Sequence, residues 1–115
     1  MMPYIPTKNF RLSMTIEQVQ NIYDQVEALV NEVNYESANM NLTALLLRPK
    51  NEIPIDSLAI VGRDGNGVMQ ALCVLYLKQY SKESKLLWFE IGTIAIRPKY
   101  RGNKLGFYLV ASACF

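Results

Sequence analysis

Three strand-like segments separated by turn sequences constrain the fold of this chain most; they span residues 57–63, 68–80 and 86–96. Residues 64–67 read Asp-Gly-Asn-Gly, a strong signal for a tight turn between antiparallel strands. The stretch 71–77 is continuously apolar, which is typical of a central strand covered on both faces. Residues 81–85 are polar and turn-like. We therefore predict an antiparallel meander.

Helical patterns precede this meander. After a short strand at 10–13, Thr15 fits a helix N-cap, with Gln18 as its capping-box partner. Apolar residues then recur at helical spacing; they are Ile16, Val19, Ile22, Val26, Leu29, Val30 and Val33. This stripe predicts an amphipathic helix that runs to about residue 34. A second short helix is expected within 36–48, ended by Pro49. The fold class is mixed α+β.

Composition excludes several kinds of chemistry. The 115 residues suit one domain, 1–115, and contain no histidine, which removes His-based triads and His metal sites. Cys73 and Cys114 lack CxxC spacing, so we expect core packing for both and no metal. The chain has no signal-peptide pattern and no apolar run long enough for a membrane span, so we expect a cytoplasmic protein without a membrane partner.

The residues around 94–106 form a candidate anion site. An apolar strand ends at Pro98, which cannot continue a ladder, and a basic, glycine-containing turn leads into an apolar helix. A helix N-terminus offers unpaired N–H groups and a positive dipole end. Arg97, Lys99, Arg101 and Lys104 add positive charge. On the residues alone, a phosphate-binding turn and a solvated basic loop are both open readings.

This segment resembles the acetyl-CoA-binding motif of the GNAT superfamily of N-acetyltransferases. Arg101, Gly102, Leu105 and Gly106 match its common Arg-Gly-x-Gly-Ile/Leu-Gly form, whereas Lys104 stands where the family usually has glycine. The upstream order of strand, helices and three antiparallel strands also agrees. The resemblance implies a GNAT-like antiparallel meander flanked by helices. It covers about the first two-thirds of such a domain, so the domain is expected to be truncated at its C-terminus.

The resemblance also implies which residues would bind acetyl-CoA. Backbone groups of the strand would bond the pantetheine arm as an added strand would, and the turn would wrap the pyrophosphate. The residues concerned are Ile94, Ala95, Ile96, Arg101, Gly102, Asn103, Lys104, Leu105 and Gly106. Arg97 or Lys99 would be near the adenosine phosphates.

Glu90 is the candidate catalytic residue. It is the only acid in an otherwise apolar strand, so it must be paired, solvated or protonated. By alternation Trp88, Glu90, Gly92 and Ile94 share one face unless a bulge intervenes, and Gly92 is the expected bulge position. In GNAT enzymes a glutamate at a similar place serves as general base. The alternative is a structural glutamate paired with Lys78, Lys82 or Lys85.

Other aromatic residues are expected to pack. Tyr100 and Tyr108 are possible proton donors by residue type only, and Trp88 suits the core or a cleft wall. The apolar helix expected at 105–115 has no C-terminal capping signal. A domain of this extent would leave apolar surface for a homodimer or a completing subunit.

The expected function is transfer of acetyl from acetyl-CoA to a primary amine, carried by a small molecule or a peptide. One alternative is a non-catalytic GNAT-like remnant that binds CoA or a protein partner. The other is a small nucleic-acid-binding module that uses the basic run at 97–104. A net charge of +2 and few interleaved aromatics argue against nucleic acid.

Overall fold

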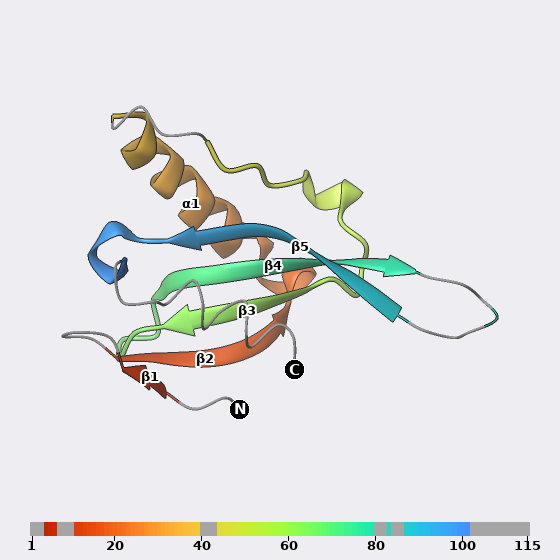
Figure 1. Cartoon of the computed structure of the whole chain (residues 1–115), viewed down its shortest axis with the longest axis horizontal. Coiled ribbons are helices and arrows are strands. Elements are labelled where there is room, and N and C mark those ends of the chain that lie inside the picture. Colours follow the sequence, from red (N-terminus) through yellow and green to blue (C-terminus); the bar gives the residue numbers. More distant parts are fainter. Residues whose placement is uncertain (1–3, 7–10, 40–43, 80–82, 84–86, 102–115) are drawn as a thin grey trace.

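The computed structural model describes residues 4–6, 11–39, 44–79, 83 and 87–101. They form five strands, one α-helix and two short 3₁₀ helices (Figure 1). In chain order these are β1 (Tyr4–Pro6), β2 (Arg11–Gln18), α1 (Val19–Ala38), η1 (Lys50–Glu52), β3 (Leu58–Arg63), β4 (Met69–Gln79), β5 (Leu87–Ile96) and η2 (Pro98–Tyr100).

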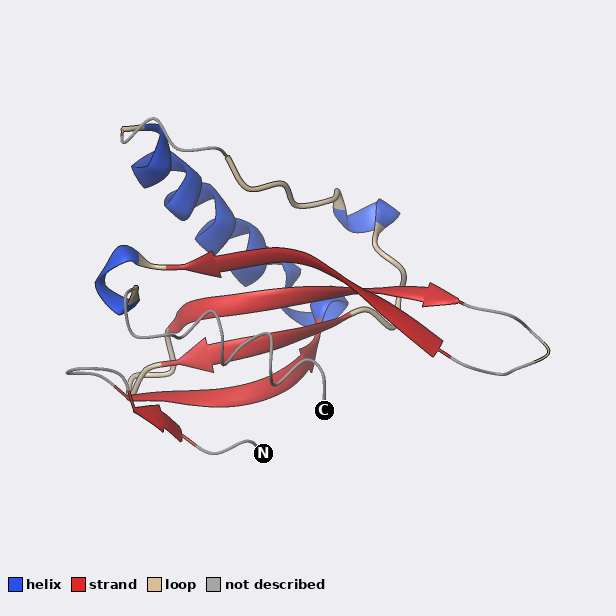
Figure 2. Cartoon of the chain, viewed as in Figure 1, coloured by secondary structure: helices blue, strands red, loops and turns tan. Residues whose placement is uncertain are grey.

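The strands form one antiparallel sheet in the order β1-β2-β3-β4-β5, and α1 lies against one face of it (Figure 2). The meander predicted from the sequence is therefore confirmed for β3, β4 and β5, each within two residues of its expected ends. These elements make a mixed α+β architecture, as predicted.

The β3–β4 turn forms as its sequence predicts. The Asp64 carboxylate accepts hydrogen bonds from the backbone N–H groups of Asn66, at 2.8 Å, and Val68, at 3.1 Å. Gly67 adopts φ +79°, a backbone conformation that side chains disfavour. This local bonding fixes the register in which β3 and β4 pair.

The core lies on both sides of β4. Residues 69–76 are all buried, which confirms the prediction of a central strand. Alternate residues face α1, whose buried side chains are Val19, Ile22, Tyr23, Val26, Leu29, Val30, Val33 and Ser37. The opposite face carries a second cluster, composed of Leu12, Met14, Ile60, Ala71, Cys73, Leu75 and Tyr100. The expectation that Cys73 packs in the core is thus confirmed.

The start predicted for the first helix is wrong. Thr15 lies inside β2, and its hydroxyl donates to Glu17 Oε2 at 2.7 Å instead of capping a helix. Ile16, counted in the helical stripe, is also in β2 and is 53% exposed. Residues 13–18 pair along β3, and these ladder bonds outweigh the local helical pattern. From Val19 onward the predicted stripe is correct, although a kink occurs at Ile22.

The second helix predicted within 36–48 is also absent from the described part of that segment. α1 continues to Ala38, and residues 44–49 form an extended segment that we call the strap. Tertiary bonds hold the strap: the Asn34 side chain bonds both backbone groups of Leu45, at 2.6 and 2.9 Å. Residues 40–43 lie outside the described part, as do 81, 82, 84, 85 and 102–115.

Within the described residues, no helix is long and apolar enough to cross a membrane.

Candidate functional site

A bulge interrupts β5. The pairing of β4 with β5 slips between Cys73 and Leu75, so that Val74 faces both Gly92 and Thr93. The bulge predicted at Gly92 is therefore confirmed. Such an insertion re-aims the side chains that follow it and bends the strand locally.

The Tyr76 ring explains why glycine occupies position 92. A Cβ atom there would lie 2.2 Å from Tyr76 Cε2, far inside van der Waals contact. The bulge also separates two residues expected on one face. Glu90 pairs with Tyr76, whose ring belongs to the α1 side, whereas Ile94 packs against the second cluster on the opposite side. Glu90 and Ile94 therefore lie on opposite faces, because the bulge expected at Gly92 breaks the plain alternation of the strand.

The predicted cofactor residues divide into two groups. Ala95 is buried, while Ile94 and Ile96 are half-buried on β5, at the edge of the described sheet. The Ile96 carbonyl accepts a hydrogen bond from Arg101 Nε at 2.9 Å. The remaining predicted residues lie outside the described part of the chain; they are Gly102, Asn103, Lys104, Leu105 and Gly106.

The basic turn after β5 is partly neutralised. Arg97 Nη1 lies 2.5 Å from Glu32 Oε2 on α1, so this arginine ties the strand end to the helix. Lys99 is exposed and lies over the ring of Tyr100, 5.3 Å from its centroid. Tyr100 is buried in the second cluster, in accord with the predicted packing role. Lys99 and Arg101 are therefore the exposed cations of this turn as far as the structure describes it.

A hollow of about 330 Å³ adjoins this turn, lined by Glu36, Arg97, Pro98 and Lys99. The Glu36 carboxylate reaches it from the C-terminal part of α1, and its buried Oε2 has no hydrogen-bond partner among the described residues. The hollow thus combines both signs of charge beside the end of β5.

Glu90 is held by cations. Its Oε2 lies 2.9 Å from Lys78 Nζ and 3.7 Å from Arg48 Nη2. The hydrogen bond and charge of Lys78, followed by the charge of Arg48, lower the pKa of Glu90. The ion pair between Glu90 and Lys78, expected if Glu90 is a structural residue, is therefore present. A lowered pKa makes a carboxylate a weaker base, so a catalytic Glu90 would first have to exchange Lys78 for substrate.

The strap crosses beside this part of β5 (Figure 1). Thr93 Oγ1 at the bulge donates to the Leu46 carbonyl. Arg48 N donates to Tyr76 Oη at 3.2 Å, and Tyr23 Oη donates to the Arg48 carbonyl at 3.1 Å. The strap is thereby fixed to α1, β4 and β5 at once.

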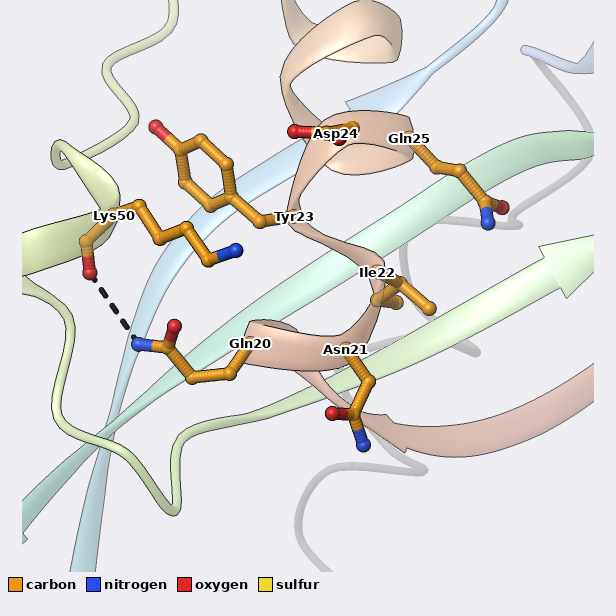
Figure 3. A pocket seen from close by; sticks show the side chains of 7 residues that line it. All are labelled: Gln20, Asn21, Ile22, Tyr23, Asp24, Gln25 and Lys50. Atoms are coloured by element: carbon orange, nitrogen blue, oxygen red, sulfur yellow. Dashed lines mark hydrogen bonds between the residues drawn. The ribbon is translucent and has the colours of Figure 1, made fainter.

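A second hollow, of about 160 Å³, lies where α1 kinks; its lining residues are Gln20, Asn21, Ile22, Tyr23, Asp24, Gln25 and Lys50 (Figure 3). Gln20 Nε2 donates to the carbonyls of Lys50, at 3.3 Å, and Ile53, at 2.9 Å. Its side chain thus joins the start of α1 to the segment that precedes β3.

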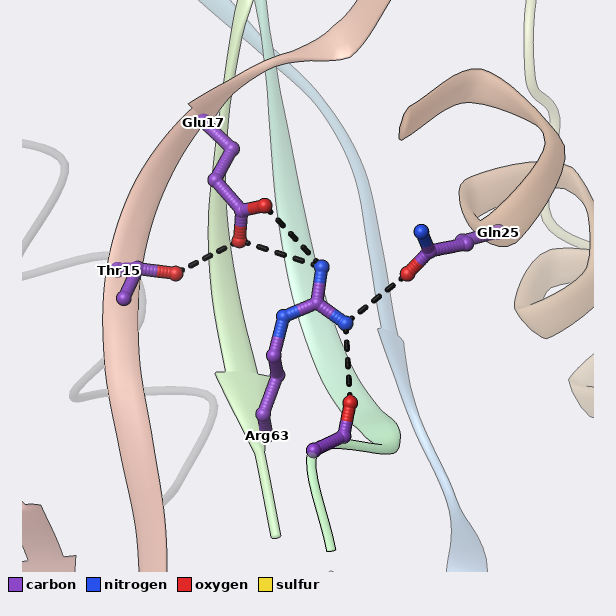
Figure 4. A network of polar contacts seen from close by, with 5 residues as sticks. Thr15, Glu17, Gln25 and Arg63 are labelled. Atoms are coloured by element: carbon purple, nitrogen blue, oxygen red, sulfur yellow. Dashed lines mark hydrogen bonds and ion pairs between the residues drawn. The ribbon is translucent and has the colours of Figure 1, made fainter. Parts of the chain in front are cut away.

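A polar network centred on Arg63 is structural. Arg63 Nη2 contacts Glu17 Oε1 at 3.1 Å, and its Nη1 donates to Gln25 Oε1 at 2.9 Å and to the Gly67 carbonyl (Figure 4). Partial burial raises the pKa of Glu17, but the bonds from Thr15 and Arg63 outweigh it and leave the pKa lowered. The network ties β2, β3 and α1 together.

Sequence reasoning did not single out Arg48, Tyr76 or Thr93. Tyr76 sits in an apolar run, and Arg48 precedes a proline in a segment expected to be helical. Their association depends on the path of the strap, for which the local pattern carries no signal. Of the other predicted residues, Tyr108 and Cys114 lie outside the described part, and the side chain of Trp88 is not described.

In the part of the chain that the structure describes, no group of three or more acidic or cysteine side chains is arranged to hold a metal ion. No model of a known protein family, no curated protein and no solved structure matches this chain.

Proposed function

We propose that the chain is an acyl-CoA-dependent N-acetyltransferase of GNAT type, which moves acetyl from acetyl-CoA to a primary amine. The observation that carries the proposal is a bulged strand, β5, which lies at the edge of the described sheet and leads directly into a basic turn. An edge strand presents unpaired backbone groups to which an amide-bearing arm binds as an extra strand. Exposed Lys99 and Arg101 at the strand end favour the phosphates of CoA.

The residues have distinct parts in this proposal. Backbone groups of Ile94, Ala95 and Ile96 hold the pantetheine arm, and the turn from Arg101 holds the pyrophosphate. The amine nitrogen attacks the thioester carbonyl, a C–N bond forms, and the C–S bond breaks. The ammonium proton leaves to Glu90 or to water before attack, and the departing sulfur takes a proton to give free CoA thiol.

Calorimetric titration of the chain with CoA tests the cofactor assignment. Arg101→Glu should weaken binding by tenfold or more, because it replaces a phosphate-facing cation by an anion. Lys50→Glu, an equal charge reversal on exposed η1, should leave the affinity unchanged. Equal effects of the two variants, or no binding by the wild-type chain at millimolar CoA, would contradict the assignment.

A second candidate is a protein that binds CoA without transferring acetyl. The ion pair of Glu90 with Lys78 favours it, because a carboxylate stabilised as an anion is a poor proton acceptor. Release of free thiol from acetyl-CoA in the presence of amines separates the two candidates. Catalysis predicts thiol release that Glu90→Gln abolishes without changing CoA affinity, whereas the second candidate predicts binding alone.

A further inference from the structure

Arg48 is held in place from three sides. Its backbone N–H and carbonyl bond the hydroxyls of Tyr76 and Tyr23, at 3.2 and 3.1 Å. Its guanidinium lies over the Tyr76 ring, 4.2 Å from the centroid, in a cation–π contact. Tyr76 is 4% exposed and Tyr23 8%, so both anchors belong to the core. The arginine is thereby positioned before any ligand arrives.

The donors of this guanidinium are not used within the described structure. Its one described charged partner is Glu90, and the 3.7 Å between Nη2 and Oε2 is too long for a hydrogen bond. Glu90 is itself bound more closely to Lys78, at 2.9 Å. The Arg48 side chain is 43% exposed, so its planar fork is accessible to a carboxylate in solution.

The charges around Arg48 select what binds there. Arg48 and Lys78 place two cations beside the single carboxylate of Glu90. The net charge of these three groups is +1, so the site repels an isolated ammonium and attracts a carboxylate. A ligand that carries both groups on one carbon makes both contacts, with its carboxylate on Arg48 and its ammonium on Glu90.

We propose that Arg48 binds the carboxylate of an amino-acid acceptor whose amine lies at Glu90. The identification of this ligand as the acceptor rests on the acetyl transfer proposed above; the carboxylate site itself does not. Glu90 precedes Ile94 by four residues, about 13 Å along an extended strand, and the bulge lies between them. The amine therefore lies on the part of β5 that precedes residues 94–96, along which the pantetheine arm is proposed to run.

Three ligands with one side chain test the site by NMR titration: leucine, isoamylamine, which lacks the carboxylate, and 4-methylpentanoate, which lacks the amine. We expect leucine to bind at least about tenfold more tightly than either. Arg48→Gln should abolish this preference, and Arg48→Lys should lose most of it, because lysine keeps the charge but not the fork. Lys50→Gln, on neighbouring η1, is the matched control and should leave it intact. Urea unfolding verifies that each variant is folded.

Four results would overturn the site. The three ligands could bind equally, leucine could fail to bind, or inorganic phosphate could bind more tightly than leucine. The fourth is an unchanged preference for leucine in a folded Arg48→Gln chain. Titration with CoA distinguishes this failure from failure of the proposed function. Leucine binding without CoA binding would support the carboxylate site and refute the acetyltransferase. CoA binding that Arg48→Gln leaves unchanged, together with lost leucine binding, is the result that both proposals predict.

Discussion

The contact between Gly92 and Tyr76 gives a sharp prediction for stability. The backbone at Gly92 does not adopt a positive φ, so its glycine is required by space alone. In Gly92→Ala the new Cβ would lie 2.2 Å from Cε2 and 2.6 Å from Cδ2 of Tyr76. The ring is 4% exposed and its hydroxyl is bonded to Arg48 N, so it cannot turn away freely.

The expected cost follows from these two features. Overpacking a well-filled site costs about 1–3 kcal/mol. Displacing the ring also breaks the bond between Tyr76 and Arg48, which contributes about 1 kcal/mol more. We therefore expect Gly92→Ala to lower the free energy of unfolding by roughly 2–4 kcal/mol, a large share of the ~5–15 kcal/mol typical of a domain.

Urea unfolding followed by circular dichroism measures this cost. Gly65→Ala is the control, because nothing lies within 4 Å of a Cβ at that position, and its effect should stay within about 0.5 kcal/mol. In the background Tyr76→Leu the penalty of Gly92→Ala should largely disappear, which a double-mutant cycle detects as coupling. A Gly92→Ala chain as stable as wild type, or an equal penalty in both backgrounds, would refute the steric argument.

Three further predictions concern polar groups. The pKa of Glu17 is lower in the folded than in the unfolded chain, where it is about 4.5. The stability that ionised Glu17 contributes is therefore present above pH 4.5 and is lost as the pH falls below this value. In Glu17→Gln the free energy of unfolding should decrease less steeply as the solution is acidified. Lys78→Met should raise the pKa of Glu90, measured by ¹³C NMR of its carboxyl carbon, and an unchanged pKa would remove lysine as the cause. Thr93→Val deletes the bond to the Leu46 carbonyl and should cost about 1 kcal/mol in urea unfolding, whereas a neutral result would show that the strap does not depend on that bond.

The meander could be predicted because its signals are local. The turn at 64–67 and the apolar run at 71–77 each specify one structure by short-range chemistry, and Gly92 marked the bulge correctly. The boundary between β2 and α1 could not be predicted in this way, because Ile16 fits both a helical stripe and an alternating strand. Pairing of residues 13–18 with β3 decides between them, and that pairing depends on residues forty or more positions away.

In the candidate site, too, only the residues with a local signal could be predicted from the sequence. Glu90 stood out as a lone acid in an apolar strand, and its lysine partner was among the alternatives read from the sequence. Arg48 did not stand out, because its role depends on the strap lying across the Tyr76 ring. A segment that is extended only because tertiary bonds hold it carries no helical or strand period of its own.

The most direct test of the acetyltransferase account is an NMR titration of the ¹⁵N-labelled chain with CoA. The account predicts saturable shifts concentrated in residues 91–106, from the bulge of β5 through the basic turn, with little change in β1 and β2. Absence of shifts at millimolar CoA, or shifts confined to residues away from β5 and its turn, would contradict it.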